Sequence, residues 1–337
     1  MARNKIDTWA NVHAQNWNSL LLGNGASIAI HKEFAYPTLH SVADANGLLT
    51  ITAQIFAKLG TTDFEHVLLA CWYAQHVNVA LGSPSDDISA AYEEVRRALI
   101  GAVHKVHPIH ADVADYLLQV GKFASAFPTV VSLNYDLTLY WAMLLFNAAN
   151  GSWFKDAFHD GEFQTDWEYL RQPYGQADGA SLVFYPHGNL SVARHYIDGE
   201  TKITASTDAT VDLLEAIVQK WSSGDYVPLF VSEGTSKEKV AAIRRSHYLT
   251  HVFEQVLPTM GERLVVFGWS FDERDRHVLE AMSKNFPKLI AVSVFTGVPD
   301  VDQQAFCQKA LDAIAPFSGS TEVIFFDSQS PSCWTNP

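Results

Sequence analysis

Four short segments carry the polar residues that could do chemistry, and each of them follows an apolar run. They are Gly23-Asn24-Gly25, Asn134-Tyr135-Asp136, His187-Gly188 and Gly268-Trp269-Ser270. An amide, a carboxylate, an imidazole and glycine-flanked loops can together hold a polar ligand, orient a water molecule and accept a proton. We therefore take these four segments as the candidate site.

The first segment has the layout of a loop that binds phosphate. The run Ser19 to Leu22 is typical of a short buried strand, and Gly23-x-Gly25-Ala26-Ser27 follows it as the start of a helix. Glycines let backbone N–H groups approach an anion closely. Ile28 replaces the third glycine of a Gly-x-Gly-x-x-Gly fingerprint. A plain strand-to-helix turn therefore stays open as an alternative to a nucleotide site.

Apolar patterns along the chain predict the elements that position these segments. Strands are expected at 19–22, 128–133, 181–186, 263–267, 289–295 and 322–326, with helices between them. Alternating strands and helices are typical of a parallel sheet, in which ligands bind at the carboxyl ends of the strands. The predicted fold class is α/β, a Rossmann-like, doubly wound and mostly parallel sheet with a helical insertion. The four polar segments are expected to meet at one edge of it.

The helical insertion is expected at residues 41–124, which show helical spacing and no strand signal. The Rossmann-like core is then discontinuous, covering 1–40 and 125–330, and 331–337 form a C-terminal tail. Alternation over 190–203 predicts a hairpin within the core.

Composition narrows the class of protein. The 337 residues are 48% hydrophobic and 18% charged, which is typical of a globular chain with a large core. A net charge of -14 argues against direct binding of nucleic acid. Many aromatic residues at a low charge fraction favour self-assembly or a protein partner. No apolar run reaches the roughly 18 residues that span a membrane, so no membrane contact is expected.

The cysteines indicate a reducing environment. Cys71, Cys307 and Cys333 lie far apart and form no Cys-x-x-Cys pair, so neither a disulfide framework nor a structural zinc site is expected. The cytoplasm is the expected location.

In combination and in order, the four segments resemble the motifs of the sirtuin-like (SIR2-like) family. Gly23-x-Gly25-Ala26-Ser27 is similar to its dinucleotide loop, Asn134-x-Asp136 to its Asn-x-Asp motif, His187-Gly188 to its catalytic His-Gly, and Gly268-x-Ser270 to its ribose loop. The two cysteine pairs that bind zinc in sirtuin deacylases are missing. The chain therefore looks like the zinc-free bacterial branch that hydrolyses NAD in anti-phage defence.

This resemblance implies an NAD glycohydrolase (NADase) that releases nicotinamide and ADP-ribose from NAD and needs no metal. Asn134 would orient the water or the ribose hydroxyls, Asp136 would fix the nicotinamide amide, and His187 would be the general base. The residues implied to bind the dinucleotide are Gly23, Gly25, Ala26, Ser27, Gly268 and Ser270. The resemblance also implies a homo-oligomer and a partner protein, such as an ATPase or an Argonaute-type protein.

Other interpretations of the same residues stay open. Asn134 and Asp136 can cap a helix that starts near Leu137, and His187 can be a turn residue. The chain can be a sensor that binds NAD or an ADP-ribose-like nucleotide without hydrolysis and regulates a partner. ADP-ribosyl transfer and zinc-free deacylation are further alternatives.

Two further patterns could indicate functional residues, but the sequence supports them less strongly than the four segments. His104, His107 and His110 are spaced by three, yet Pro108 breaks the helix that would align them as metal ligands. Arg274-Asp275-Arg276 is most simply the solvated first turn of a helix.

Overall fold

Eight parallel strands form the central sheet of this computed structural model, which describes residues 3–35, 38–195, 199–204, 213–231 and 234–337. Their order is β1-β13-β12-β11-β2-β3-β7-β4, and every neighbouring pair is parallel. The strands are β1 (Ile6–Asp7), β2 (Ser19–Leu22), β3 (Thr129–Ser132), β4 (Phe154–Lys155), β7 (Ser181–Phe184), β11 (Arg263–Phe267), β12 (Leu289–Val294) and β13 (Glu322–Asp327).

The chain winds this sheet in two directions from β2. It first runs outward through β3 to β7, and later returns beside β2 as β11 and runs outward the other way through β12 to β13. In the sheet these six strands lie in the order β7-β3-β2-β11-β12-β13. Numbered by their sequence in the chain, this is the order 3-2-1-4-5-6 of dinucleotide-binding sheets. The predicted α/β, doubly wound class is confirmed. The topological switch point lies between β2 and β11.

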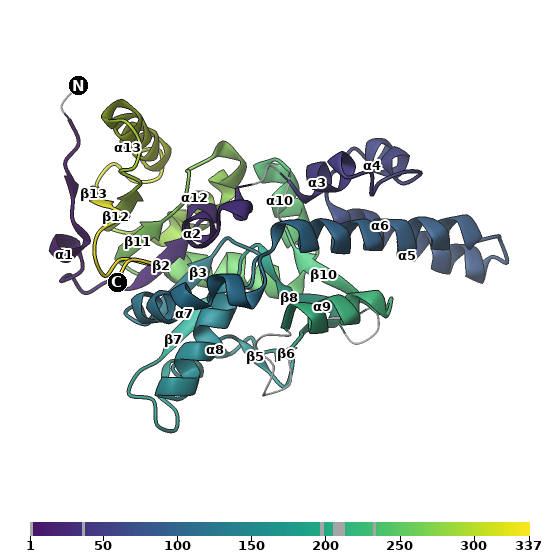
Figure 1. Cartoon of the computed structure of the whole chain (residues 1–337), viewed down its shortest axis with the longest axis horizontal. Helices are drawn as coiled ribbons and strands as arrows, with labels where there is room; N and C mark the ends of the chain where they lie inside the picture. Colours follow the sequence, from purple (N-terminus) through teal and green to yellow (C-terminus); the bar gives the residue numbers. More distant parts are fainter. Residues whose placement is uncertain (1–2, 36–37, 196–198, 205–212, 232–233) are drawn as a thin grey trace.

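Helices cover both faces of the sheet, which explains why its strands are continuous apolar runs. Helices α7 (His110–Ala124) and α8 (Thr138–Asn150) lie on one side, and α12 (Arg276–Met282) and α13 (Asp300–Ile314) on the other (Figure 1). Leu20 and Leu21 of β2 are fully buried, as are Leu264 and Val265 of β11. Two short helices, α1 (Trp9–Val12) and α2 (Asn24–Ile30), flank β2 in the chain.

The long crossover from β2 to β3 is helical. It contains α3 (Leu39–Ala45), α4 (Ala53–Leu59), α5 (Phe64–Ala80), α6 (Asp86–Val106) and α7. Helices α5 and α6 lie side by side and extend away from the sheet (Figure 1). Pro108 separates α6 from α7, as the break in the helical pattern indicated. Helix α7 packs against α8 and is therefore part of the layer on the sheet.

A second, antiparallel sheet, with the order β10-β8-β9-β6-β5, is built from segments on both sides of β7 in the chain. Its strands are β5 (Phe158–His159), β6 (Glu162–Phe163), β8 (Gly188–His195), β9 (Gly199–Lys202) and β10 (Tyr226–Phe230). Strands β8 and β9 are the two arms of the expected hairpin, and 196–198 lie outside the described residues. The chain between β9 and β11 also contains three helices, α9 (Leu213–Ser222), α10 (Ser236–Ile243) and α11 (His247–His251).

The C-terminal residues, expected to be a tail, pack onto the core. Trp334 is 1% exposed, and its ring lies beside Phe123 and Phe267. Its Nε1–H donates a hydrogen bond of 2.8 Å to the carbonyl of Ala26. The end of the chain thus holds the first turn of α2 in place.

Candidate functional site

The four polar segments meet at the carboxyl edge of the sheet, as the sequence predicted. Gly23 follows β2, Asn134 follows β3, His187 follows β7, and Gly268 follows β11. The Gly25 N–H donates to the Gly268 carbonyl at 2.7 Å, and Asn134 Nδ2 donates to the Gly23 carbonyl at 3.0 Å. Residues from three strands are therefore tied together beside the switch point, where open α/β sheets bind their ligands.

The glycines of the first and last segments allow their loops to touch. Gly268 has a φ of +67°, and a Cβ there would lie 2.2 Å from the Ala26 nitrogen. A Cβ on Gly25 would lie 2.7 Å from the Gly268 carbonyl oxygen. Neither position has room for a side chain, so a loop-to-loop contact explains both glycines.

The backbone N–H groups expected to hold a pyrophosphate are already used. Gly25 donates to Gly268, and Ala26 donates to the Gly23 carbonyl at 2.9 Å. This differs from the cradle that the sequence suggested, because the glycines serve the contact between loops. In this arrangement neither N–H is available to an anion.

Asn134 and Ser27 join the first two segments through their side chains. Asn134 Nδ2 also donates to Ser27 Oγ at 2.8 Å, and Ser27 Oγ donates to Asp136 Oδ2 at 2.5 Å. Asn134 is half-buried, and within the described parts of the chain its amide oxygen accepts no hydrogen bond. The network therefore fixes the amide and leaves its oxygen for a ligand.

Asp136 is turned into the protein. It is 5% exposed, and its Oδ1 accepts hydrogen bonds from the backbone N–H of Thr138 at 2.9 Å and from the Thr138 hydroxyl. Thr138 is the first residue of α8, so these contacts hold the start of the helix, whereas its N-cap residue is Leu137, which provides no side-chain cap. Both carboxylate oxygens therefore have partners within the protein, and the expected contact of Asp136 with a nicotinamide amide stays a prediction.

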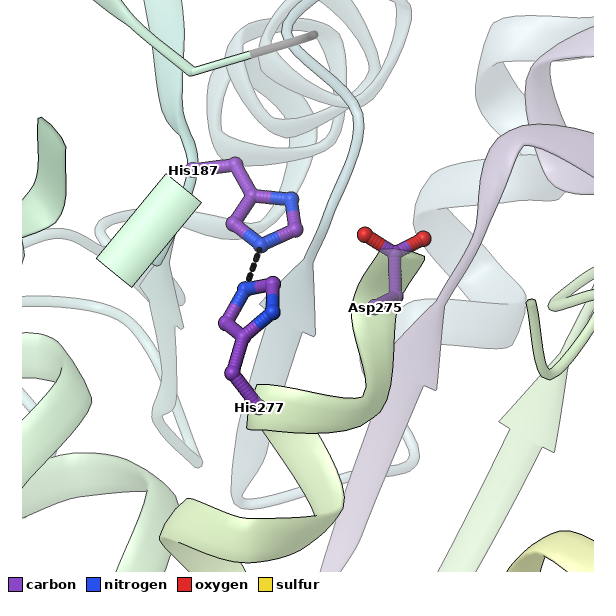
Figure 2. Close-up of side chains that lie close together, drawn as sticks. All are labelled: His187, Asp275 and His277. Carbon is purple, nitrogen blue, oxygen red and sulfur yellow. Dashed lines mark hydrogen bonds between the residues drawn. The ribbon is translucent and has the colours of Figure 1, made fainter. Parts of the chain in front are cut away.

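His187 is deeply buried beside this network. It is 3% exposed, and the Leu133 carbonyl, next to Asn134, lies close enough to the ring to stabilise its protonated form. Its Nε2 lies 2.8 Å from Nε2 of His277 (Figure 2). Burial, helped by the positive charge of Lys239, lowers the pKa of His187 to about 3. The imidazole is therefore neutral at pH 7, the form in which a histidine can accept a proton.

This histidine pair lies beside three residues that were not predicted as site residues, namely Ser236, Lys239 and Asp275. His277 Nδ1 lies 3.3 Å from Ser236 Oγ, and Lys239 Nζ donates to Asp275 Oδ1 at 2.6 Å. Asp275 was interpreted as part of a solvated turn, but it is half-buried and paired with Lys239. In the sequence, only the short distance between Asp275 and the Gly268-x-Ser270 segment pointed to the site. The other residues, Ser236 and Lys239, belong to α10, which is distant in the chain.

His187, Asp275 and His277 are of types that bind metals, and one donor atom from each lies within 4.8 Å of the others. Two nitrogen ligands about 2.0–2.1 Å from a tetrahedral zinc ion would be about 3.3 Å apart. The observed 2.8 Å is a hydrogen-bond distance, and the ammonium of Lys239 already neutralises Asp275. This arrangement suits a shared proton better than a cation.

The evenly spaced histidines of the crossover have separate partners. His107 is buried, and its Nε2 accepts the N–H of Leu137 at 3.0 Å while Nδ1 contacts the Pro108 carbonyl. His104 faces Glu215, and His110 packs against Trp141. Their contacts are structural.

Gly268 and Ser270 of the last segment differ in their surroundings. The Gly268 N–H donates to Ser293 Oγ at 2.9 Å, whereas Ser270 is exposed. Trp269 is 3% exposed, and its indole N–H has no partner within the described ranges. A surface hollow of about 490 Å³ lies elsewhere, between α9 and β10.

Comparisons with known proteins give a family without a described activity. A family model described as "Domain of unknown function (DUF4917)" matches residues 20–334. No curated protein sequence matches the chain. A structure titled "Structural Basis for the Mechanism and Regulation of Sir2 Enzymes" is similar at 10% identity and a TM-score of 0.33, covering 91% of this chain and 96% of the other. Among the described residues, no helix has the length and apolarity to cross a membrane.

Proposed function

The chain belongs to the family described as Domain of unknown function (DUF4917), a description that assigns no activity, and we propose that it hydrolyses NAD at the bond between nicotinamide and ribose. The observation that carries the proposal is the meeting of Gly23, Asn134 and Gly268 at the switch point of a 3-2-1-4-5-6 sheet. Dinucleotides bind at that position in such sheets.

The side chains suit the chemistry of this cleavage. Breaking the bond builds positive charge on the ribose, and nicotinamide leaves neutral, so the site needs an oriented water and a base more than an acid. The Asn134 side chain is held by the hydrogen bonds from its Nδ2 to Ser27 and Gly23, and its amide oxygen can orient that water or a ribose hydroxyl. His187, neutral at pH 7, is the base. Asp136 supports Asn134 through Ser27 rather than touching NAD.

The burial of His187 favours a second candidate function. A base that is 3% exposed and hydrogen-bonded to His277 does not reach a substrate without a local rearrangement. A sensor that binds NAD without cleaving it would have no need of such a rearrangement. Release of nicotinamide separates the two functions.

The finer proposal is that the enzyme depletes NAD as an effector of bacterial anti-phage defence, held off until a trigger or partner protein acts. The buried base and the occupied N–H groups of Gly25 and Ala26 support a resting state. Exposed Tyr73 and Val79 on α5, and Leu81 directly after it, support assembly into a homo-oligomer or with a partner such as an ATPase or an Argonaute-type protein.

The test of the proposal is product analysis with purified protein and NAD. Nicotinamide and ADP-ribose in equal amounts are the expected products. Saturable NAD binding without nicotinamide would support the sensor instead, and label transferred from NAD to a protein would support ADP-ribosyl transfer.

A further inference from the structure

We propose that His277 is the positioning residue for His187, holding one tautomer of its ring and carrying its displaced proton to Ser236. The proposal rests on the hydrolase function proposed above, because it assigns His187 as the base. It names a second histidine, on α12, that the motif pattern does not contain.

The geometry gives each nitrogen of His187 a separate environment. Nε2 of His187 meets His277 Nε2 at 2.8 Å, and the other nitrogen, Nδ1, points away from His277 (Figure 2). The Leu133 carbonyl, directly beside Asn134, also lies close to the ring. Because His277 occupies Nε2, a substrate hydroxyl can exchange a proton only with Nδ1, and only after a local rearrangement uncovers this buried ring.

His277 can stabilise the tautomer that leaves Nδ1 available. When His187 carries its proton on Nε2, it donates to His277 Nε2, and His277 must then carry its own proton on Nδ1. The Ser236 hydroxyl lies 3.3 Å from that atom and can accept its proton, and the Arg274 carbonyl also lies close to the ring. The Ser236 hydroxyl oxygen is held in place because it also accepts the backbone N–H of His277 at 3.2 Å.

The proton transfer balances along this chain of groups. A ribose hydroxyl or water gives its proton to His187 Nδ1 as its oxygen attacks or polarises the anomeric carbon. The Nε2 proton of His187 moves to His277 Nε2, and the Nδ1 proton of His277 moves to the Ser236 hydroxyl oxygen. Ser236, half-buried at the start of α10, passes a proton to solvent. Each group loses one proton for each one gained.

Charged neighbours allow the pair to carry a transient proton. Asp275 raises the affinity of both imidazoles for a proton, and Glu280 adds to this effect at His277. Lys239 opposes it and is itself paired with Asp275. His277 is fully buried and packs against Phe253, so its ring is fixed.

The test compares His277→Phe, His277→Gln and Ser236→Ala with the full-length chain. Because it keeps the ring shape without a nitrogen, His277→Phe is expected to lower kcat for NAD about 100-fold with KM within about twofold. His277→Gln restores an acceptor and is expected to recover part of that loss. Ser236→Ala is expected to lower kcat less. His251→Phe, a half-buried histidine contacting Trp167, is the matched control and keeps full activity.

A second readout does not need activity. Selective ¹⁵N-histidine NMR assigned with His187→Gln is expected to give an Nε2–H tautomer for His187 in the parent protein and a shift toward Nδ1–H in His277→Phe. An unchanged tautomer or an unchanged kcat in His277→Phe would overturn the role of His277. Absence of NAD turnover in the parent protein with the expected tautomer shift would overturn the hydrolase alone.

Metal ions supply the last control. Stoichiometric Co²⁺ binding with ligand-field bands that vanish in His277→Phe would replace the proton relay by a metal site and overturn the proposal. Unchanged kcat in the presence of a chelator supports it.

Discussion

The Gly25 N–H donates a hydrogen bond of 2.7 Å to the Gly268 carbonyl, which joins the loops after β2 and β11 across the switch point of the sheet. The contact requires that neither residue has a side chain, since a Cβ on Gly268 would lie 2.2 Å from the Ala26 nitrogen. The loop-to-loop contact therefore shapes the edge of the sheet at which we place NAD.

Gly268→Ala is expected to lower the free energy of unfolding by about 2 kcal/mol or more, because the position combines a φ of +67° with a clash against backbone. Urea unfolding measures the change. Gly319→Ala is the control, since a Cβ there meets nothing within 4 Å, and its stability is expected to stay within about 0.5 kcal/mol. Equal stability of the two variants would contradict the account of the loop.

Asn134→Ala is expected to abolish nicotinamide release, with at least a roughly 100-fold fall in kcat, because the oriented amide is lost. It also removes two hydrogen bonds, to the Gly23 carbonyl and to Ser27 Oγ, which costs about 1–2 kcal/mol of stability. Activity assays and thermal unfolding on one preparation separate the effects. A folded Asn134→Ala with parental kcat would exclude this residue from catalysis.

Asp136→Asn is expected to act on stability first. The buried carboxylate accepts from Ser27 and from two groups of Thr138, and the amide cannot accept from all of them. A loss of about 2–3 kcal/mol in urea unfolding is expected. A direct contact with nicotinamide predicts the opposite pattern, a raised KM at unchanged stability.

Stability is expected to fall in acid through the histidine pair. Burial lowers the pKa of His187 to about 3 and that of His277 to about 4, from an ordinary 6.5. Below pH 6.5 the unfolded chain binds protons that the folded chain does not, so stability declines as the pH falls from 6.5 toward 3. The decline is up to about 1.4 kcal/mol per pH unit for each histidine.

Urea unfolding at a series of pH values measures this slope, with His277→Gln beside the parent protein. The variant is expected to lose stability less steeply between pH 6.5 and 4, because it lacks one of the two groups. Parallel curves would show that His277 does not have the lowered pKa.

The sheet could be predicted from the sequence because its strands are short apolar runs, each followed by a polar or glycine-containing segment. The runs Ser19 to Leu22 and Arg263 to Phe267 are both strands of the sheet, as their apolar patterns predicted, and the structure pairs them. The order of the strands could not be derived in this way, since it depends on which crossovers pack together. Strands of two residues, such as β5 and β6, have no periodicity to detect.

The site could be predicted only at the level of its segments. Asn134 and His187 were found because each follows a strand. The direction of each side chain depends on distant partners: Thr138 turns Asp136 inward, and His277 from α12 covers His187. Lys239 and Ser236 lie on α10, and nothing in the sequence near α10 connects them with a histidine after β7.

The central claim is that the site at the carboxyl edge of the sheet cleaves NAD with His187 as the base. Its most direct test is nicotinamide release by the purified chain and by His187→Ala. The assay spans a wide range of protein concentrations, since assembly is proposed to activate the enzyme. We expect turnover in the parent protein that disappears in His187→Ala while its circular dichroism spectrum is unchanged. Equal turnover in both proteins, or NAD binding without nicotinamide at every concentration, would contradict the claim.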